Sequence, residues 1–327
     1  MIRRYAFLIL PALIIILLTQ SARSQDAWVD KSPHKSGYVT ANGIKLHYLD
    51  WGGKGRTLVF LAGVGNSAHI FDDIAPKFTD RFRVLALTRR GHGQSDKPTT
   101  GYGLPTLTED IRQFLDELHL KRVTLIGHSF AGDEMTRFAA LYPERVEKLV
   151  YLDAAYDRAD LSSEALSKNP FPTPRATKEE LSTLAGYRRW WERNRGFWSD
   201  AVEADLRETS VAQDGSIKST LTREAGQGIF KNASEYRPDY TKIKAPALSF
   251  YAISGLPLWI PSDEEARRKA REFLDNANAP YQRKNIEKFK SEMRRGRVIE
   301  VRDSHHYLFI KNLDEVVREM RTFLLSR

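Results

Sequence analysis

The sequence VTLIGHSFAG (residues 123–132) decides the fold. Its first four residues form a short apolar run, and residues 131–142 have the apolar spacing of a helix. The segment between them is therefore a tight turn from a buried strand into a helix. Small residues around Ser129 let the strand and helix approach closely, and such a turn exposes the serine hydroxyl. We interpret Ser129 as a nucleophile, with an ordinary glycine–serine turn as the alternative.

Extended and helical segments alternate on both sides of this turn. The sequence GYVTANGIKLHYLD (residues 37–50) is divided by Asn-Gly at 42–43, a strong signal for a β-hairpin. We predict further strands at 57–62, 83–87, 122–126, 148–152, 247–251 and 297–301, and helices at 107–118, 131–142 and 312–325. Buried strands separated by amphipathic helices predict an α/β fold with a mainly parallel sheet flanked by helices.

The alternation of strands and helices stops over residues 156–240. This stretch has a proline-rich turn region and helical segments that carry several aromatic residues, including Trp190, Trp191 and Trp198. We predict that it is a helical cap inserted between two strands. The core of the domain would then consist of residues 25–155 and 241–327, with a charged helical segment at 262–295.

The first residues have the composition of a secretory signal peptide. Two arginines at positions 3–4 precede an apolar stretch at 6–18, and small residues at 22 and 24 form an A-x-A-like cleavage site. We predict a signal peptide over residues 1–24, a mature chain that begins near Gln25, and export to the periplasm or secretion. The apolar stretch is shorter than a membrane-spanning helix, so no stable membrane span is expected after the leader is removed.

Composition and charge favour a globular enzyme. The chain has 327 residues, of which 41% are hydrophobic, and it contains no cysteine, which excludes disulfides. The leader holds three arginines and no acid, so its removal lowers the formal net charge from +9 to +6. The charges are scattered through segments such as 264–272, so we expect a solvated surface and no nucleic-acid partner. None of these features indicates an oligomeric state.

Three motifs together resemble the α/β-hydrolase fold superfamily, and the resemblance extends from about residue 37 to residue 325. The first is the serine turn, in which Ala131 replaces the second glycine of G-x-S-x-G and Gly132 follows one place later. The second is LAGVG (residues 61–65), where the family usually has His-Gly. The third is RGHGQSD (residues 90–96), a mainly structural turn in the family, so His92 is not expected to be catalytic.

The resemblance implies an oxyanion hole made of two backbone N–H groups. These belong to Val64, which follows Gly63, and to Phe130, which follows Ser129. Because backbone groups stabilise the negative oxygen, Ala62 in place of the family's histidine changes the shape of the pocket more than the mechanism. The alternative is a glycine-rich turn that merely ends a strand.

The family places its general base after the final strand, where this chain has RDSHHYLF (residues 302–309). The match to the family's G-x-x-H-aromatic pattern favours His306, with His305 as the competing neighbour. We expect His128 to point away from the site. The remaining histidines have no motif support and are expected to be ordinary surface or core residues: His34, His47, His69 and His119.

The acid that orients the histidine departs from the commoner family pattern. After the strand at 247–251 the sequence is AISGL (residues 252–256), without the usual aspartate. Related hydrolases and dehalogenases also use the end of the preceding strand, where LVYLD (residues 149–153) provides Asp153. We predict Asp153 as the acid, with Asp263 as the second candidate. A plain turn-capping role for Asp153 is the alternative.

We therefore predict a serine hydrolase that cleaves a small carboxylic ester or lactone through an acyl-enzyme, with Ser129, His306 and Asp153 as the triad. Epoxide hydrolases and haloalkane dehalogenases of this fold attack with aspartate, so Ser129 argues against both. Two alternatives stay open: a cofactor-free peroxidase or C–C hydrolase on the same triad, and a non-catalytic protein that binds a small ligand. The sequence has no metal-binding motif, and we expect no cofactor.

Overall fold

The structure is a computed structural model, and it describes residues 28–162, 166, 168–253 and 255–326. The chain divides into two compact units, Met1–Asp30 and Lys31–Arg327, and the second contains all helices and strands given below. The signal peptide predicted at 1–24 and its cleavage site lie outside the described residues, and export stays a prediction. Among the described residues, no helix combines the length and apolar character needed to cross a bilayer.

One sheet forms the centre of the second unit. Its strands are β1 (Lys35–Ala41), β2 (Ile44–Gly52), β3 (Thr57–Leu61), β4 (Arg83–Leu87), β5 (Val123–His128), β6 (Val146–Leu152), β7 (Ala247–Ile253) and β8 (Gly296–Arg302). Within the described residues they follow the order β1-β2-β4-β3-β5-β6-β7-β8. The pairs β1–β2 and β2–β4 are antiparallel, and all other neighbours are parallel. The predicted α/β class with a mainly parallel sheet is confirmed.

Helices connect these strands. The α-helices are α1 (Leu104–Glu117), α2 (Ala131–Leu141), α4 (Leu184–Arg195), α5 (Asp200–Thr209), α6 (Arg223–Glu235), α7 (Glu264–Phe273), α8 (Ala279–Glu292), α9 (Leu308–Lys311) and α10 (Leu313–Leu325). A π-helical turn at Leu274–Asn278 joins α7 to α8. Short 3₁₀ helices include η1 (Ala68–Phe71), η2 (Ala75–Phe78) and η4 (Arg158–Ser162).

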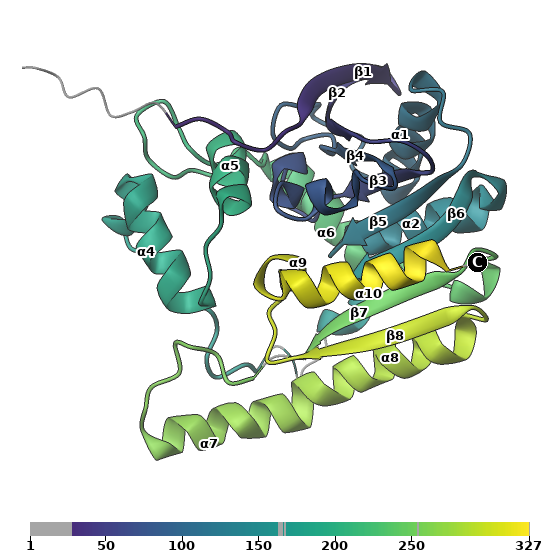
Figure 1. The fold of residues 1–327 in the computed structure, drawn as a ribbon. Coiled ribbons are helices and arrows are strands. Elements are labelled where there is room, and N and C mark those ends of the chain that lie inside the picture. Colours follow the sequence, from purple (N-terminus) through teal and green to yellow (C-terminus); the bar gives the residue numbers. More distant parts are fainter. Residues whose placement is uncertain (1–27, 163–165, 167, 254, 327) are drawn as a thin grey trace, which may run out of the picture. The chain divides into compact units, whose positions relative to one another are not determined.

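Both faces of the sheet are covered, and strand β3 illustrates why. Side chains alternate between the two faces of a strand. Leu58 and Phe60 pack with η1, η2 and α10 on one face, whereas Val59 and Leu61 pack with α1, α2 and α8 on the other. Figure 1 shows α10 on one side of β7 and β8 and α8 on the opposite side. The continuous apolar runs in the sequence therefore mark strands that are buried on both faces.

The ends of two elements differ from the predicted ends, and each difference has a physical reason. Strand β5 continues to His128 because His128 still pairs with Leu152 of β6. Helix α1 begins at Leu104, earlier than predicted, because Gly103 is extended and a proline occupies the first helical turn, where its missing N–H costs nothing. The predicted hairpin is present, and Asn42 and Gly43 have the positive φ angles of its turn.

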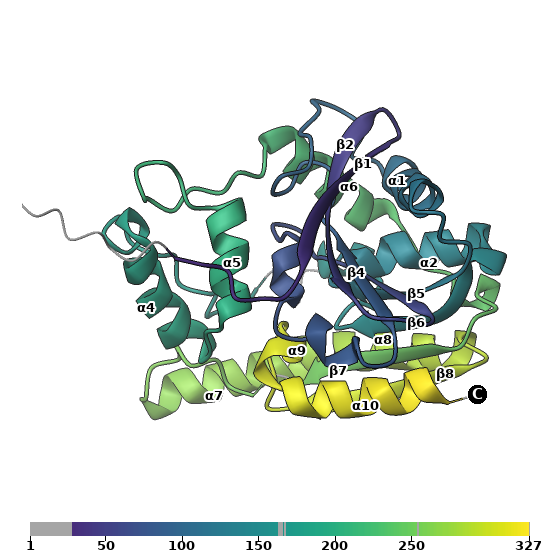
Figure 2. The same ribbon diagram turned by 45° about the horizontal axis from the view of Figure 1, so that its top comes forward.

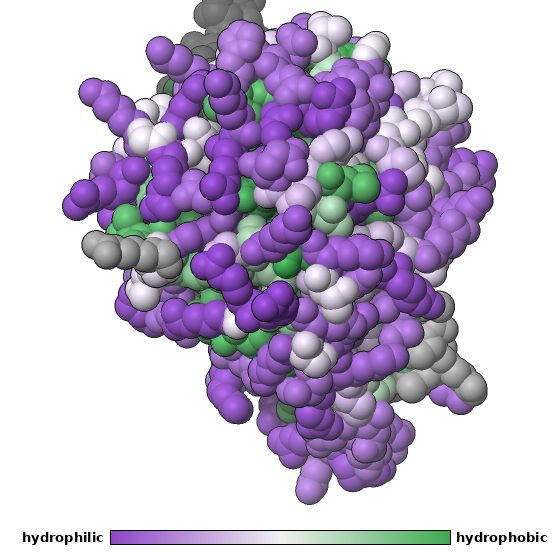
Figure 3. Space-filling model, turned by 90° about the vertical axis from the view of Figure 1, so that its right-hand side faces the viewer, coloured by the Kyte–Doolittle hydropathy of each residue, from purple (hydrophilic) through white to green (hydrophobic). Residues whose placement is uncertain are grey.

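The described elements between β6 and β7 are mainly helical. They include α4, α5 and α6. Among the described residues of this stretch, the extended pairing is limited to an isolated bridge between Val211 and Ile217. These helices belong to the same compact unit as the sheet. Figure 2 shows α4 and α5 beside the sheet, next to the ends of its strands. The face drawn in Figure 3 carries mainly hydrophilic residues, with small apolar areas between them.

Close packing at the serine turn gives a stability prediction. A Cβ added to Gly132 would overlap the carbonyl oxygen of Ala154, whereas one added to Gly226 in α6 meets its nearest atom at 3.8 Å. We expect Gly132→Ala to lower the free energy of unfolding by about 1–3 kcal/mol, since overlap with backbone forces the elements apart. Gly226→Ala, the matched control, should raise it by up to about 1 kcal/mol. Urea unfolding followed by circular dichroism measures both, and equal stability of the two variants would contradict the packing argument.

Candidate active site

Ser129 occupies a strained turn at the end of β5. Its φ angle is +56°, in the left-handed region that non-glycine residues rarely adopt. Hydrogen bonds on both sides hold the turn: the Ser129 N–H donates to the Leu152 carbonyl at 3.4 Å, and the Gly132 N–H donates to the Ser129 carbonyl at 3.0 Å. A Cβ added to Gly127 would lie 2.6 Å from the sulfur of Met135 and 3.2 Å from the Ala131 carbonyl carbon, so glycine at 127 favours the close approach of the strand and the helix.

His306 and Asp153 form a hydrogen-bonded pair. The Nδ1 atom of His306 lies 2.7 Å from a carboxylate oxygen of Asp153. The other oxygen accepts hydrogen bonds from the Tyr156 hydroxyl at 2.7 Å and the Ala252 N–H at 3.0 Å. An ionised carboxylate only accepts, so the proton of neutral His306 is on Nδ1 and its Nε2 carries the lone pair of a base.

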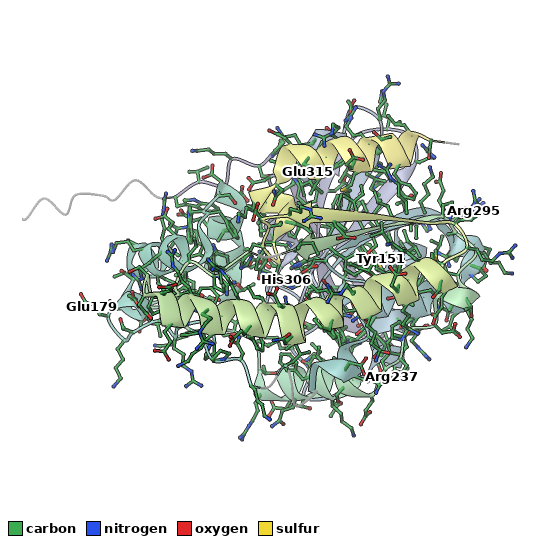
Figure 4. All side chains as sticks on the ribbon, turned by 90° about the horizontal axis from the view of Figure 1, so that it is seen from below. Tyr151, Glu179, Arg237, Arg295, His306 and Glu315 are labelled. Carbon is green, nitrogen blue, oxygen red and sulfur yellow. The ribbon has the colours of Figure 1, made fainter. Side chains whose placement is uncertain are left out.

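Ser129, His306 and Asp153 line one cavity of about 320 Å³. The sheet topology brings them together. Strands β5, β6, β7 and β8 are consecutive and parallel, so their carboxyl ends lie at the same edge of the sheet. In the view of Figure 4, His306 lies between Glu179, from the stretch between β6 and β7, and Tyr151 of β6. The Ser129 hydroxyl makes no hydrogen bond with His306 among these described residues; such contacts often tighten only when substrate binds.

Two further histidines lie next to His306 but do not line this cavity. His128 is buried, its ring centroid is 4.5 Å from that of His306, and its Nε2–H donates to the His306 carbonyl at 3.1 Å. Burial lowers the pKa of His128 well below its usual value. Burial and the nearby Arg195 lower the pKa of His305 to about 3. Both rings are therefore neutral at physiological pH, and His128 supports the backbone of His306.

The loop that carries Val64 lies against the serine turn. A Cβ added to Gly63 would lie 2.9 Å from His128 Nδ1 and 3.0 Å from the Ser129 Cβ, so this backbone approaches the nucleophile as closely as a glycine allows. Phe130 is the N-cap residue of α2, and its N–H lies outside the hydrogen-bond ladder of that helix. The two predicted oxyanion donors thus belong to segments on adjoining sides of Ser129.

A buried ion pair that we did not predict holds this loop. Arg89 donates to the carbonyls of Ala62 at 2.7 Å and Gly63 at 3.2 Å, and it pairs with Glu134 of α2 at 2.6 Å. The pair joins the loop before Val64 to the helix that follows Ser129. Arg89 directly precedes the RGHGQSD motif, but its partner is 45 positions away, so no local pattern links the two residues.

A second unpredicted arginine clamps the serine turn. Arg158 lines the cavity and donates to the carbonyls of Ser129 at 2.5 Å and Ala154 at 3.1 Å. Its other nitrogen pairs with Asp133 at 2.6 Å. Burial raises the pKa of Asp133 to about 7, although the positive charge of Arg158 opposes this rise. Arg158, which lies shortly after β6, therefore fixes the backbone of Ser129.

Asp263, the second candidate for the acid, has a different role. It is the N-cap residue of α7, and its carboxylate accepts a hydrogen bond from the Ala266 N–H at 2.8 Å. The side chain is exposed and does not line the cavity. The geometry therefore pairs His306 with Asp153 and leaves Asp263 as a helix cap.

A buried carboxylate of α5 ties the helical stretch between β6 and β7 to the core, next to the Val64 loop. Asp205 of α5 accepts hydrogen bonds from the Ser67 N–H at 2.6 Å, the Ser67 hydroxyl at 2.9 Å and the Asn66 side-chain amide at 2.7 Å. Asn66 in turn accepts a hydrogen bond from the Tyr307 hydroxyl at 3.2 Å. Burial raises the pKa of Asp205 to about 7, against the effect of these donors.

Side chains capable of binding a metal gather away from the cavity. His69 Nδ1 lies 2.8 Å from Asp72 and its Nε2 lies 3.2 Å from Glu208, while His34 Nε2 lies 3.5 Å from Asp72. Burial lowers the pKa of His69, but its bonds to the two carboxylates outweigh this and raise it to about 10. A protonated imidazole cannot bind a metal. In the sequence these histidines have no motif support, and 35 positions separate His34 from His69.

Comparison with known proteins identifies the fold. A family model described as the alpha/beta hydrolase fold matches residues 56–215. The chain is 38% identical over 119 residues to a non-heme chloroperoxidase of Streptomyces lividans, which covers 36% of this chain and 43% of the relative. It is 34% identical over 101 residues to a 2-(acetamidomethylene)succinate hydrolase of Mesorhizobium japonicum, covering 31% of this chain and 36% of the relative. The chain thus spans less than half the length of these two relatives.

Solved structures extend this likeness over most of the chain. The crystal structure of E-2-(acetamidomethylene)succinate hydrolase covers 90% of this chain and 100% of its own, with a TM-score of 0.64 and 19% identity. An enol-lactonase from Burkholderia xenovorans covers 89% of this chain and 100% of its own, with a TM-score of 0.57 and 21% identity. At these identities the likeness concerns the fold.

The buried carboxylate of Asp205 gives a prediction for stability against pH. Its pKa is about 7 in the folded protein against an ordinary value of 3.8, so between about pH 4 and 7 the folded state binds more protons than the unfolded state. Ionisation of Asp205 in this window therefore lowers the free energy of unfolding as pH rises. Asp205→Asn does not titrate, so from pH 5 to 7 its stability relative to wild type should rise by about 1 kcal/mol per pH unit. Urea unfolding at pH 5, 6 and 7 measures this, and a constant difference would refute the buried titration.

Proposed function

Because the chain belongs to the α/β-hydrolase fold superfamily, we propose that it is a serine hydrolase that cleaves a carboxylic ester or lactone. The observation that carries the proposal is the His306–Asp153 hydrogen bond of 2.7 Å in the cavity that also contains Ser129. A nucleophile, a base and a carboxylate that orients the base are the three groups that acyl transfer through serine requires. Ser129 also distinguishes the chain from relatives of this fold that attack with aspartate.

In the proposed acylation step, the Ser129 oxygen attacks the carbonyl carbon of the substrate and its proton moves to Nε2 of His306. Asp153 stabilises the imidazolium that forms, since its carboxylate already accepts the proton on Nδ1. The negative oxygen of the tetrahedral intermediate accepts hydrogen bonds from the N–H groups of Val64 and Phe130. The intermediate then collapses, the alcohol leaves with the proton from His306, and the acyl group stays on Ser129.

In deacylation, water is the nucleophile and Ser129 is the leaving group. His306 removes a proton from water, the hydroxide oxygen attacks the acyl carbon, and the same two N–H groups stabilise the second intermediate. Collapse of this intermediate releases the carboxylic acid and returns the proton to Ser129. In a lactone the acyl and alcohol parts are one molecule, so the product is a single hydroxy acid.

The first test is hydrolysis of p-nitrophenyl esters of increasing acyl length by the chain from Gln25. Ser129→Ala removes the nucleophile and should lower kcat by about 10³-fold or more. Asp153→Asn keeps the shape of the pair but presents a donor to Nδ1, and we expect a fall of roughly 10³–10⁴-fold. Asp263→Asn is the matched control for the acid and should leave kcat within about twofold, since Asp263 only caps α7.

The outcomes of this test separate the competing assignments. A large loss in Asp263→Asn together with a small loss in Asp153→Asn would reverse the choice of acid. Absence of turnover on every ester, with no labelling of Ser129 by a fluorophosphonate, would refute the serine hydrolase and favour a protein that binds a small ligand without catalysis.

The oxyanion donors can be tested through the space beside Ser129. Gly63→Ala places a methyl group 2.9–3.0 Å from His128 and Ser129, so the Val64 loop must move away from the nucleophile. We expect kcat to fall by about 10²-fold, as when one oxyanion donor is lost, with KM nearly unchanged. Gly65→Ala is the control for the loop, since nothing lies within 4 Å of its added Cβ, although its φ of +85° brings some strain. A rise in KM with normal kcat would show that the loop binds substrate rather than the oxyanion.

A further inference from the structure

A second cavity adjoins the one that contains Ser129. Its volume is about 420 Å³, and His306 lines both cavities. One part of its wall is apolar, from Leu256 to Trp259, and another carries the side chains of Arg195, His305 and Lys311. A substrate with its ester group at Ser129 therefore has room to extend past His306 into a space with both apolar and basic walls.

Arg195 is held at this cavity by aromatic rings. It is the last residue of α4, and its guanidinium carbon lies 4.6 Å from the ring centre of Trp191 and 5.7 Å from that of Trp190. One terminal nitrogen donates to Nε2 of His305 at 3.1 Å. The Nε atom is buried and has no hydrogen-bond partner. Packing thus fixes the guanidinium while it leaves part of its donor capacity unused.

Among the described residues, no carboxylate balances the charge of the partly buried Arg195, unlike the charges of three other buried or partly buried arginines. Arg89, Arg90 and Arg158 each pair with a carboxylate, at 2.6, 2.5 and 2.6 Å. Within the part of the chain that the structure describes, no carboxylate lies within 4.0 Å of the Arg195 guanidinium. A partly desolvated cation without a counter-charge is costly, and a bound anion would remove that cost.

The cavity wall around Arg195 carries one further cation, one acidic residue and a neutral histidine. His305 is neutral, because burial and Arg195 itself lower its pKa to about 3. Lys311 is exposed and brings a second cation to the cavity. Asp303 is the one acidic residue of the cavity wall, and its contact with the Lys311 amine is through the backbone carbonyl at 2.8 Å.

We propose that this second cavity binds a carboxylate group of the substrate, with Arg195 as the main partner and Lys311 as the second. The inference rests on the proposed hydrolase function of Ser129 and narrows its substrates to esters or lactones that carry a free carboxylate. A guanidinium offers paired N–H donors in the plane that a carboxylate matches. The apolar wall contacts the carbon chain between that carboxylate and the ester.

The test compares two esters with acyl chains of equal length. p-Nitrophenyl hydrogen glutarate has a terminal carboxylate, and p-nitrophenyl pentanoate has a methyl group in its place. We expect kcat/KM of the wild type to be at least tenfold higher for the glutarate ester. In a second assay, free glutarate should slow fluorophosphonate labelling of Ser129, whereas neutral glutaramide should not.

Three variants assign the preference to Arg195. Arg195→Gln should abolish both the preference for the glutarate ester and the protection by free glutarate. Arg195→Lys keeps the charge without the paired donors and should restore part of the preference. Arg193→Gln is the matched control, because Arg193 is on the same helix but is exposed and pairs with Glu180 at 2.5 Å. Thermal midpoints of all variants identify any that fail to fold.

The possible results are distinct. If the pentanoate ester is hydrolysed and neither assay reveals a carboxylate preference, or if Arg195→Gln keeps the preference, the carboxylate site is refuted and the serine hydrolase stands. If no ester is hydrolysed and Ser129 is not labelled, the proposed function fails and the carboxylate site fails with it. A preference that is lost in Arg195→Gln, partly restored in Arg195→Lys and intact in Arg193→Gln supports the proposal.

Discussion

The left-handed backbone at Ser129 is the constraint on which the rest of the site depends. A non-glycine residue with φ near +56° costs of order 1–3 kcal/mol, so the surrounding structure must hold it there. Glycine at 127 brings β5 close to α2, and glycine at 132 lets α2 approach Ala154, which follows β6. Hydrogen bonds from Gly132 and Arg158 fix the Ser129 carbonyl.

The parallel sheet explains why residues from distant parts of the sequence meet. Ser129 follows β5, Asp153 follows β6, and the loop with His306 follows β8, so each leaves the sheet at its carboxyl edge. Positive φ angles recur there, at Asp153 and Asp303 as well as at Ser129. Strained residues thus gather where the strands end, and the buried faces of the sheet supply the packing that keeps them in place.

The sequence predicts those parts of the structure that depend on local patterns. The strands, the Asn42–Gly43 hairpin and the serine turn each combine a periodic apolar run with a specific turn residue, and these predictions agree with the structure. Arg89 and Glu134 were missed because their pairing requires knowledge of which loop lies against which helix. The same holds for Asp205, which shares no motif with Ser67. His306 and Asp153 were chosen by family resemblance, since spacing in the sequence does not indicate a hydrogen bond between residues 153 positions apart.

Polar contacts also tie the helical stretch between β6 and β7 to the candidate site. Asp205 of α5 accepts three hydrogen bonds from Asn66 and Ser67, which directly follow the Val64 loop. Each such bond contributes about 1 kcal/mol when made, and an ionised carboxylate left buried without them would cost more. A displacement of α5 from the core would therefore draw this loop with it or break all three bonds together. The position of α5 and the position of the Val64 backbone are consequently coupled through a few buried atoms near Ser129.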